Sequence, residues 1–181
     1  MQHPTSASTA KSEPSAMTLN PIRGRINAVF FAAMDWYMHW KYADVKRQLF
    51  ADLPPTLVEI GAGTGANFRY LPRGSKVIAV EPNRYMHASL RRSAARWAVD
   101  LEIQELGAEG LDLGDASVEA VICSLVLCTV ESPAQVISEI RRVLVPDGRF
   151  ICIEHVAAPA HTLIGRLQRW VFRPWKWFFE G

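Results

Sequence analysis

The chain has 181 residues, of which 49% are hydrophobic and 21% are charged, with a net charge of +2 at pH 7. This length and composition suit one globular domain. The small net charge argues against a general nucleic-acid binder, which would carry a larger basic excess. The three cysteines form no CxxC pair, so we predict buried thiols in the reducing cytoplasm, with no disulfide framework and no metal site.

The first half of the chain begins with a polar tail. Residues 1–20 are rich in Ser, Thr and Pro, so we expect a disordered tail without a secretion or transit signal, and Met17 is an alternative start. Residues 21–53 are predicted to form a helical cap, with one helix over 22–51, and Pro54-Pro55 ends it. Apolar residues recur there at helical spacing: Ile26, Val29, Phe30, Ala33, Tyr37 and Trp40. No apolar run near the start is long enough to span a membrane.

Short apolar segments then alternate with helical ones. The predicted strands are Thr56–Ile60, Lys76–Val80, Leu101–Gln104, Ala120–Leu125 and Arg149–Glu154. A helix over Asn83–Trp97 has Asn83 as its N-cap, and a second helix begins at Ser132-Pro133. Pro146-Asp147-Gly148 is predicted to be a turn. This alternation predicts an α/β fold with a doubly wound, mainly parallel sheet of order 3-2-1-4-5, over residues 54–160.

A glycine-rich turn follows the first predicted strand. Gly61, Gly63 and Gly65 lie between that strand and the next segment, where glycine allows a tight turn and close approach of a ligand. Glu81 lies 20 residues after Gly61, at the end of the second strand, where a carboxylate can accept hydrogen bonds from ribose hydroxyls. The alternative is an ordinary tight turn followed by a solvated acid.

The charge beside this turn selects among nucleotide ligands. The spacing is G-x-G-x-G instead of the dinucleotide fingerprint G-x-G-x-x-G, and Glu59 lies within the strand itself. A carboxylate there would repel a pyrophosphate but would suit a ligand with a cationic amine and no phosphate. S-adenosylmethionine has an α-amine, a sulfonium and a ribose, so it is favoured over NAD.

These motifs resemble those of class I S-adenosylmethionine-dependent methyltransferases. The matching segments are Glu59–Gly65, Glu81-Pro82-Asn83, Ala108-Glu109 and Leu144–Gly148. A narrower resemblance, to the methyltransferase-like family of thiol S-methyltransferases, rests on Gly63–Phe68, Ser124–Cys128 and Glu154–Ala158. Phospholipid and quinone methyltransferases are near relatives in pattern.

The resemblance implies a role for each matching position. Gly61, Ala62 and Gly63 would lie by the methionine part of the cofactor, and Glu59 would hold its amine. The other implied contacts are Glu81 with the ribose, Pro82, Ala108 and Glu109 with the adenine, and Ser124 and Leu125 with the amine. Many family members have an Asp just before the alanine, where this chain has Gly107, so adenine recognition must use backbone or Glu109.

The acceptor side is described less fully by the sequence. His155 is the candidate catalytic residue, with a structural histidine as the equal alternative, because it follows the fifth strand at the ligand-binding edge. Cys128, Asp35, Tyr37, Tyr42 and Asn67 are weaker candidates. The apolar stretch Ser124–Leu127 replaces the Asn/Asp-Pro-Pro-Tyr motif of nucleobase methyltransferases. We therefore expect a small lipophilic acceptor: a thiol first, then a phospholipid amine or a quinone ring.

The last segment, residues 161–181, combines aromatic residues with Arg166, Arg169, Arg173 and Lys176 on one predicted helical face. Such a helix can lie on a membrane surface, although covering the core is the more common role. Similar methyltransferases continue with two more strands. A rival prediction is therefore a non-catalytic cofactor-binding module, inactive because those strands are missing.

Overall fold

The computed structural model describes residues 21–154, 161–163, 166 and 170. The predictions made for residues 1–20, for His155 and for most of 161–181 lie outside these residues. Cytoplasmic location and membrane contact stay predictions. The elements in chain order are α2 (Pro21–Phe50), β1 (Thr56–Ile60), η1 (Phe68–Tyr70), β2 (Lys76–Val80), α3 (Arg84–Trp97), β3 (Asp100–Gln104), β4 (Val118–Ser124), α4 (Pro133–Val143) and β5 (Leu144–Ile153).

The five strands form one parallel sheet in the order β3-β2-β1-β4-β5, which confirms the predicted topology. Chain connections run outward from β1 in both directions, first to β2 and β3 and then to β4 and β5. The order therefore reverses between β1 and β4. In doubly wound sheets a ligand crevice forms at this point, beyond the carboxyl ends of the strands.

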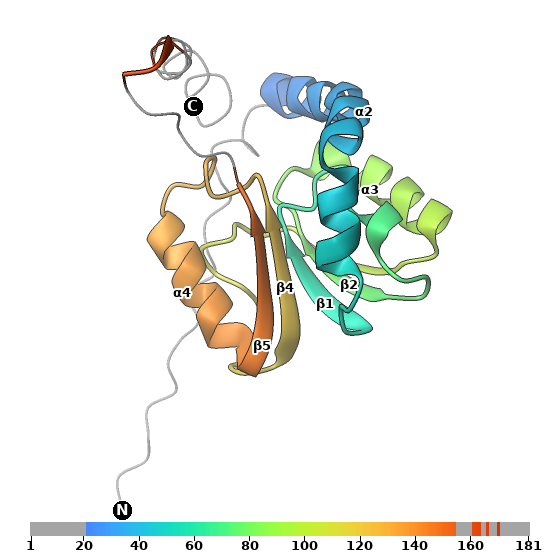
Figure 1. Cartoon of the computed structure of the whole chain (residues 1–181), viewed down its shortest axis with the longest axis vertical. Coiled ribbons are helices and arrows are strands. Elements are labelled where there is room, and N and C mark those ends of the chain that lie inside the picture. The colour runs from blue at the N-terminus through green and yellow to red at the C-terminus, as the bar shows by residue number, and fades with distance from the viewer. Residues whose placement is uncertain (1–20, 155–160, 164–165, 167–169, 171–181) are drawn as a thin grey trace, which may run out of the picture.

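Helices cover both faces of the sheet (Figure 1). Along β1, Leu57 packs into a cluster with Phe50 of α2 and Leu90 of α3. Val58 faces the opposite way, into a cluster with Val136 of α4. Because both faces are buried, β1 is apolar and buried from Leu57 to Ile60 except for the acid Glu59.

The helix starts follow their predicted caps. The Asn83 side chain accepts a hydrogen bond from the Tyr85 N–H, and the Ser132 side chain accepts one from the Gln135 N–H. Each cap satisfies an N–H group that the first turn of a helix leaves without a partner. Pro133 occupies the first turn of α4, where a proline costs no hydrogen bond.

Helix α2 confirms the predicted segment, but most of the predicted apolar stripe is exposed. Val29 and Trp40 are 71% and 72% exposed. The buried residues described on this helix are instead Gly24, Asn27, Lys46 and Phe50. Helical spacing alone shows which residues share a face, not whether another element covers that face. Among the described residues, no helix combines the length and apolar character that crossing a bilayer requires.

Strand β5 also differs from its predicted form. It begins at Leu144, and its register against β4 shifts between the pairs Val118–Leu144 and Ala120–Arg149. The predicted turn at 146–148 is thus an irregularity within the strand, with Asp147 at φ 64°. In the described part of the chain β5 pairs with β4 alone.

The prediction of buried thiols is wrong for two of the three cysteines. Cys123, in the central strand β4, is buried, whereas Cys128 and Cys152 are exposed. Cys152 lies on the edge strand β5, and Cys128 lies in the loop after β4. Apolar context therefore identifies a buried cysteine only where strands pair on both sides.

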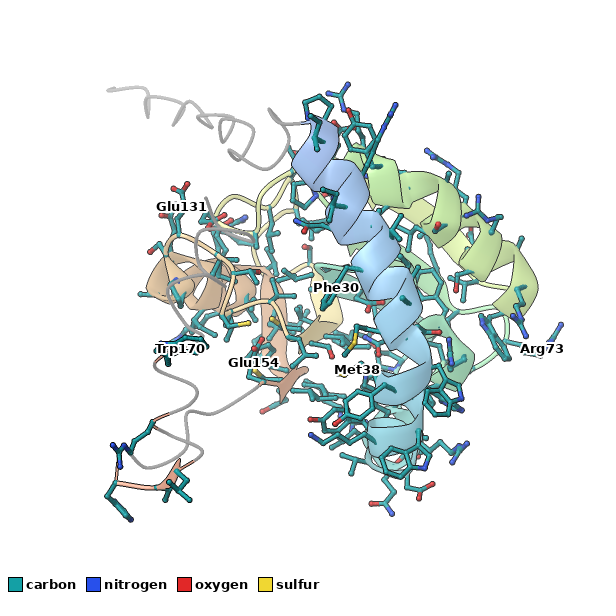
Figure 2. The ribbon with its side chains drawn as sticks, turned by 90° about the horizontal axis from the view of Figure 1, so that it is seen from above. Phe30, Met38, Arg73, Glu131, Glu154 and Trp170 are labelled. Atoms are coloured by element: carbon teal, nitrogen blue, oxygen red, sulfur yellow. The ribbon has the colours of Figure 1, made fainter. Side chains whose placement is uncertain are left out.

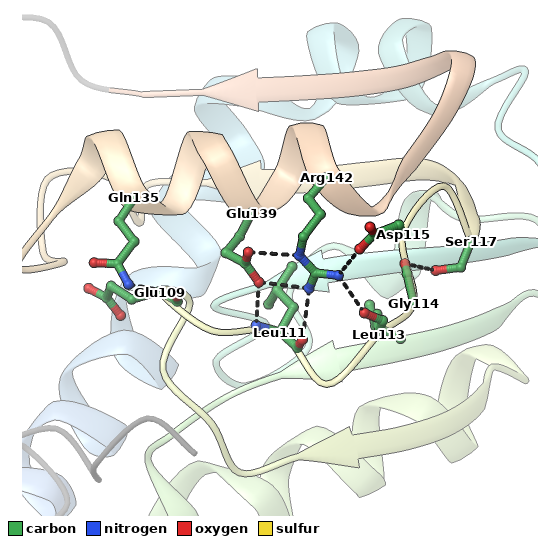
Figure 3. Close-up of polar contacts among 9 residues, drawn as sticks. All are labelled: Glu109, Leu111, Leu113, Gly114, Asp115, Ser117, Gln135, Glu139 and Arg142. Carbon is green, nitrogen blue, oxygen red and sulfur yellow. Dashed lines mark hydrogen bonds and ion pairs between the residues drawn. The ribbon is translucent and has the colours of Figure 1, made fainter. Parts of the chain in front are cut away.

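Arg142 of α4 fixes the loop that precedes β4 (Figure 3). Its guanidinium donates to both carboxylate oxygens of Glu139, each at 2.8 Å, and to Asp115 at 2.7 Å. It also donates to the backbone carbonyls of Leu111 and Leu113, at 3.1 and 2.8 Å. The planar guanidinium has enough donors for all of these acceptors at once.

Replacing Arg142 with methionine should lower the free energy of unfolding by ~1–3 kcal/mol, because two carbonyls and two carboxylates lose a charged donor. Arg141→Met, which changes the exposed neighbour, is the matched control and should cost under ~0.5 kcal/mol. Urea unfolding of both variants measures the difference, and equal midpoints would show that the Arg142 contacts contribute nothing.

Candidate functional site

The turn after β1 has the conformation that its glycines permit. Gly61, Gly63 and Gly65 all have positive φ angles, of 64°, 57° and 79°. The Gly61 N–H donates to the Val80 carbonyl at 2.8 Å, so the turn stays tied to the end of β2. A side chain at Gly61 would collide with Val126, whereas the nearest heavy atom to a Cβ at Gly63 would be 3.8 Å away. A side chain at Gly63 would therefore make only ordinary van der Waals contacts.

Glu81, at the end of β2, contacts this turn directly. Its carboxylate accepts hydrogen bonds from the N–H groups of Gly63 and Asn83, each at 2.8 Å. Burial raises the pKa of Glu81, while these two N–H groups act in the opposite direction. The structure thus brings together the glycine turn and the acid that the sequence placed on neighbouring strand ends.

Glu59 is the second acid of the site, and it is only 1% exposed. Its Oε1 accepts a hydrogen bond from Asn67 Nδ2 at 2.7 Å, while its buried Oε2 has no partner among the described residues. Burial raises the pKa of Glu59 to about 7, against the lowering effects of Asn67 and Lys46. A buried carboxylate oxygen without a donor is a site that a cationic or N–H ligand group can fill.

Lys46 of α2 is a buried residue beside the acidic site that sequence reasoning missed. Its Nζ donates to Asn67 Oδ1 at 2.6 Å, and the side chain is buried. One signal could have revealed it, because Lys46 lies four residues before Phe50, on the face of α2 that enters the core. A lysine on a buried face requires an acidic or acceptor partner.

The end of β4 lies beside the end of β1. Leu125 lies just beyond the strand at φ 61°, an unusual conformation for a leucine. The next two N–H groups, of Val126 and Leu127, both donate to Oε1 of Glu154, at 2.7 and 2.9 Å. Glu154 was not predicted to have this role. Ser124, the last residue of β4, is half-buried.

The remaining implied cofactor residues are less closely grouped. Ala62 and Ala108 are buried, and Pro82 is half-buried. The Glu109 carboxylate accepts from the Glu131 N–H at 3.2 Å, and the Glu109 carbonyl accepts from the Gln135 side chain at 3.0 Å (Figure 3). Glu109 is therefore held against the start of α4.

Among the weaker candidates, Asn67 alone joins the acidic site. Asp35 forms an ion pair with Arg69, and Tyr37 is 40% exposed. Figure 2 shows Phe30 and Met38 projecting from α2 toward the middle of the molecule, with Glu154 on the opposite side of that space. Both side chains are half-buried.

Together, these features define a doubly wound nucleotide-cofactor domain with an acid within β1 and another at the end of β2. A methyltransferase-domain family model matches residues 58–152, more than half of the chain, and the chain belongs to this family. The resemblance to class I S-adenosylmethionine-dependent methyltransferases is thereby confirmed, with S-adenosylmethionine as the cofactor of the class.

Curated relatives narrow the comparison. The chain is 37% identical to the mouse thiol S-methyltransferase TMT1B over 163 residues, which cover 84% of this chain and 67% of the relative. It is 34% identical to human thiol S-methyltransferase TMT1A over 150 residues, which cover 77% of this chain and 62% of the relative. The chain thus spans roughly two thirds of the length of these relatives.

Solved structures agree on the fold. The YcgJ protein of Bacillus subtilis superposes with a TM-score of 0.58 at 24% identity, covering 72% of this chain and 58% of that one. The geranyl diphosphate C-methyltransferase of Streptomyces coelicolor, solved with S-adenosyl-L-homocysteine, gives 0.51 at 21% identity, covering 60% and 43%.

Alanine at Gly61 and alanine at Gly63 should lower the stability of the protein by different amounts. Both substitutions strain a positive φ, which costs ~1–2 kcal/mol. Gly61→Ala must also displace Val126, which adds ~1–3 kcal/mol for overpacking. Thermal unfolding should therefore show a larger loss for Gly61→Ala than for Gly63→Ala. The reverse order would mean that Val126 does not pack on the turn.

Proposed function

We propose that this protein transfers a methyl group from S-adenosylmethionine to a small lipophilic acceptor, with a thiol as the first choice. The observation that carries the proposal is the buried Oε2 of Glu59, in the strand that leads into the glycine turn, which accepts no hydrogen bond from any residue that the structure describes. An anion at this place opposes a phosphate-bearing cofactor and favours one that carries an amine. Membership of the methyltransferase-domain family supports the same choice.

The residues present suit each part of this cofactor. Glu59 would hold the amine, beside Gly61, Ala62 and Gly63, with backbone at Ser124 and Leu125 nearby. Glu81 has accepted two N–H groups and still has lone pairs for the ribose hydroxyls. The adenine would lie against Pro82, Ala108 and Glu109. When bound, S-adenosylmethionine supplies an already activated methyl group, so the protein needs no covalent nucleophile.

The task left to the chain is to orient the two reactants and to exclude water. The attacking acceptor atom must lie in line with the methyl carbon and the departing sulfur. Val126 and Leu127, held by Glu154, would line the acceptor side together with Phe30 and Met38 of α2. A thiol also has to lose its proton, and His155, which directly follows Glu154, is our proposed group for this step.

The relatives support a thiol acceptor, and a quinone ring and a phospholipid amine stay as the alternatives. TMT1A and TMT1B are named as thiol S-methyltransferases. More distant relatives include a ubiquinone/menaquinone C-methyltransferase of Acidiphilium cryptum, 30% identical over 138 residues covering 70% of this chain and 54% of the relative. The apolar residues of the proposed acceptor side suit a lipophilic acceptor better than a small charged substrate.

Glu81→Ala should weaken binding of S-adenosyl-L-homocysteine by ~1–3 kcal/mol, because the ribose hydroxyls lose a charged acceptor. Glu102→Ala removes an exposed acid from the adjacent β3 and should leave the affinity unchanged. Titration calorimetry measures both, with NAD as a ligand that should not bind. Unchanged affinity in Glu81→Ala would place the ribose elsewhere.

Incubation with methyl-labelled S-adenosylmethionine and a panel of alkyl and aryl thiols, phospholipid amines and quinols should label the thiols most strongly. Transfer to amines or quinols alone would contradict the thiol assignment. If S-adenosyl-L-homocysteine binds tightly while no acceptor is labelled, the rival prediction of a non-catalytic cofactor-binding module would be favoured.

A further inference from the structure

Three side chains connect helix α2 to the acid within β1. The Lys46 ammonium donates to Asn67 Oδ1 at 2.6 Å, and Asn67 Nδ2 donates to Glu59 Oε1 at 2.7 Å. All three residues are buried, with 6%, 4% and 1% of their surface exposed. A cation and an anion are therefore joined through one carboxamide inside the protein, between α2 and β1.

The polarity of this chain of hydrogen bonds permits only one orientation of the amide. Lys46 can only donate, and an ionised Glu59 can only accept. A reversed Asn67 would turn its NH₂ group toward the ammonium and its oxygen toward the carboxylate, so both contacts would become repulsive. Asn67 thus links Lys46 to Glu59 through two hydrogen bonds. It also fixes the direction of one carboxylate oxygen of Glu59.

The surrounding charges determine how much Glu59 depends on Lys46. Besides Asn67, the groups that act on Glu59 are Lys46, which favours its ionised form, and Glu81, which disfavours it. Burial lowers the pKa of Lys46, and Arg69 acts in the same direction, whereas Glu59 and Asp35 raise it. The centroid of the Tyr70 ring lies 5.9 Å from Lys46 Nζ. Lys46 is therefore a cation that, with Asn67, partly offsets the effects of burial and of Glu81 on Glu59.

We propose that Lys46 is a positioning residue of the cofactor site, which acts through Asn67 to keep Glu59 ionised and oriented for the cofactor amine. This inference rests on the proposed role of Glu59. It makes α2 part of the cofactor site, although α2 lies outside the matched family segment. It also links cofactor binding to a proton, because the protonated form of Glu59 must lose its proton to accept the amine.

The sign of the pH dependence follows from the pKa of Glu59, which is about 7. Affinity for an amine-bearing ligand should rise as the pH increases through 7, because the ionised form becomes dominant. Loss of the Lys46 charge raises that pKa further. A rise of about one unit lowers the ionised fraction at pH 7 from about one half to about one tenth, and the affinity about fivefold.

Lys46→Met keeps the length of the side chain and removes its charge. Calorimetric titration with S-adenosyl-L-homocysteine between pH 6 and 8.5, in buffers of different ionisation enthalpy, gives both the affinity and the protons released. We expect the affinity midpoint to move up by about one pH unit, with more protons released at pH 7. Lys41→Met, on an exposed part of the same helix, is the matched control and should reproduce the unsubstituted protein.

The outcomes separate the inference from the proposed function. If the unsubstituted protein binds no S-adenosyl-L-homocysteine at any pH, both are overturned. If it binds, and Lys46→Met has the same midpoint and proton release, the inference alone is overturned. Should Lys46→Met fail to fold by circular dichroism, Glu59→Gln decides. Loss of the pH dependence and of proton release supports the linkage, and their persistence overturns it.

Discussion

Glu59 is a carboxylate with almost no exposed surface in the middle of a parallel sheet, and the rest of the site depends on how its charge is compensated. Burial of an unpaired charge is costly, so such groups are retained where hydrogen bonds and an opposite charge stabilise them. Here Asn67 supplies the hydrogen bond and Lys46 the charge, and one oxygen has no donor within the described part of the chain. The central strand thus carries a buried acid at the point where strand order reverses.

Much of the fold could be predicted from the sequence because its local signals agree with one another. β1 and β2 have the predicted limits, since each is an apolar run that ends at residues unable to continue it. The strand order follows from right-handed crossovers. Both predicted caps form, because Asn83 and Ser132 precede segments with strong helical periodicity. In the site, the contact between Glu81 and Gly63 follows from the parallel strand ends.

What the sequence did not reveal depends on contacts between distant segments. The apolar spacing of α2 predicted its face wrongly, because Gly24 and Phe50 make the inward contacts while Val29 and Trp40 stay exposed. Glu154 holds two N–H groups of the loop after β4, a role that requires β5 to lie beside β4. Lys46 reads as an ordinary charged residue until Asn67 is placed beside it.

The contact between Lys46 of α2 and Asn67 also determines how much of the chain the folded domain needs at its N-terminal side. The family model starts at residue 58, and an expression boundary chosen there would retain Glu59 and Asn67. It would discard the ammonium that faces them, together with Phe50 of the core. The shortened protein would then keep the acid and its Asn67 partner but lose the cation bonded to that amide. Under the role that we propose for Glu59, the affinity for an amine-bearing ligand would fall even if the sheet formed normally.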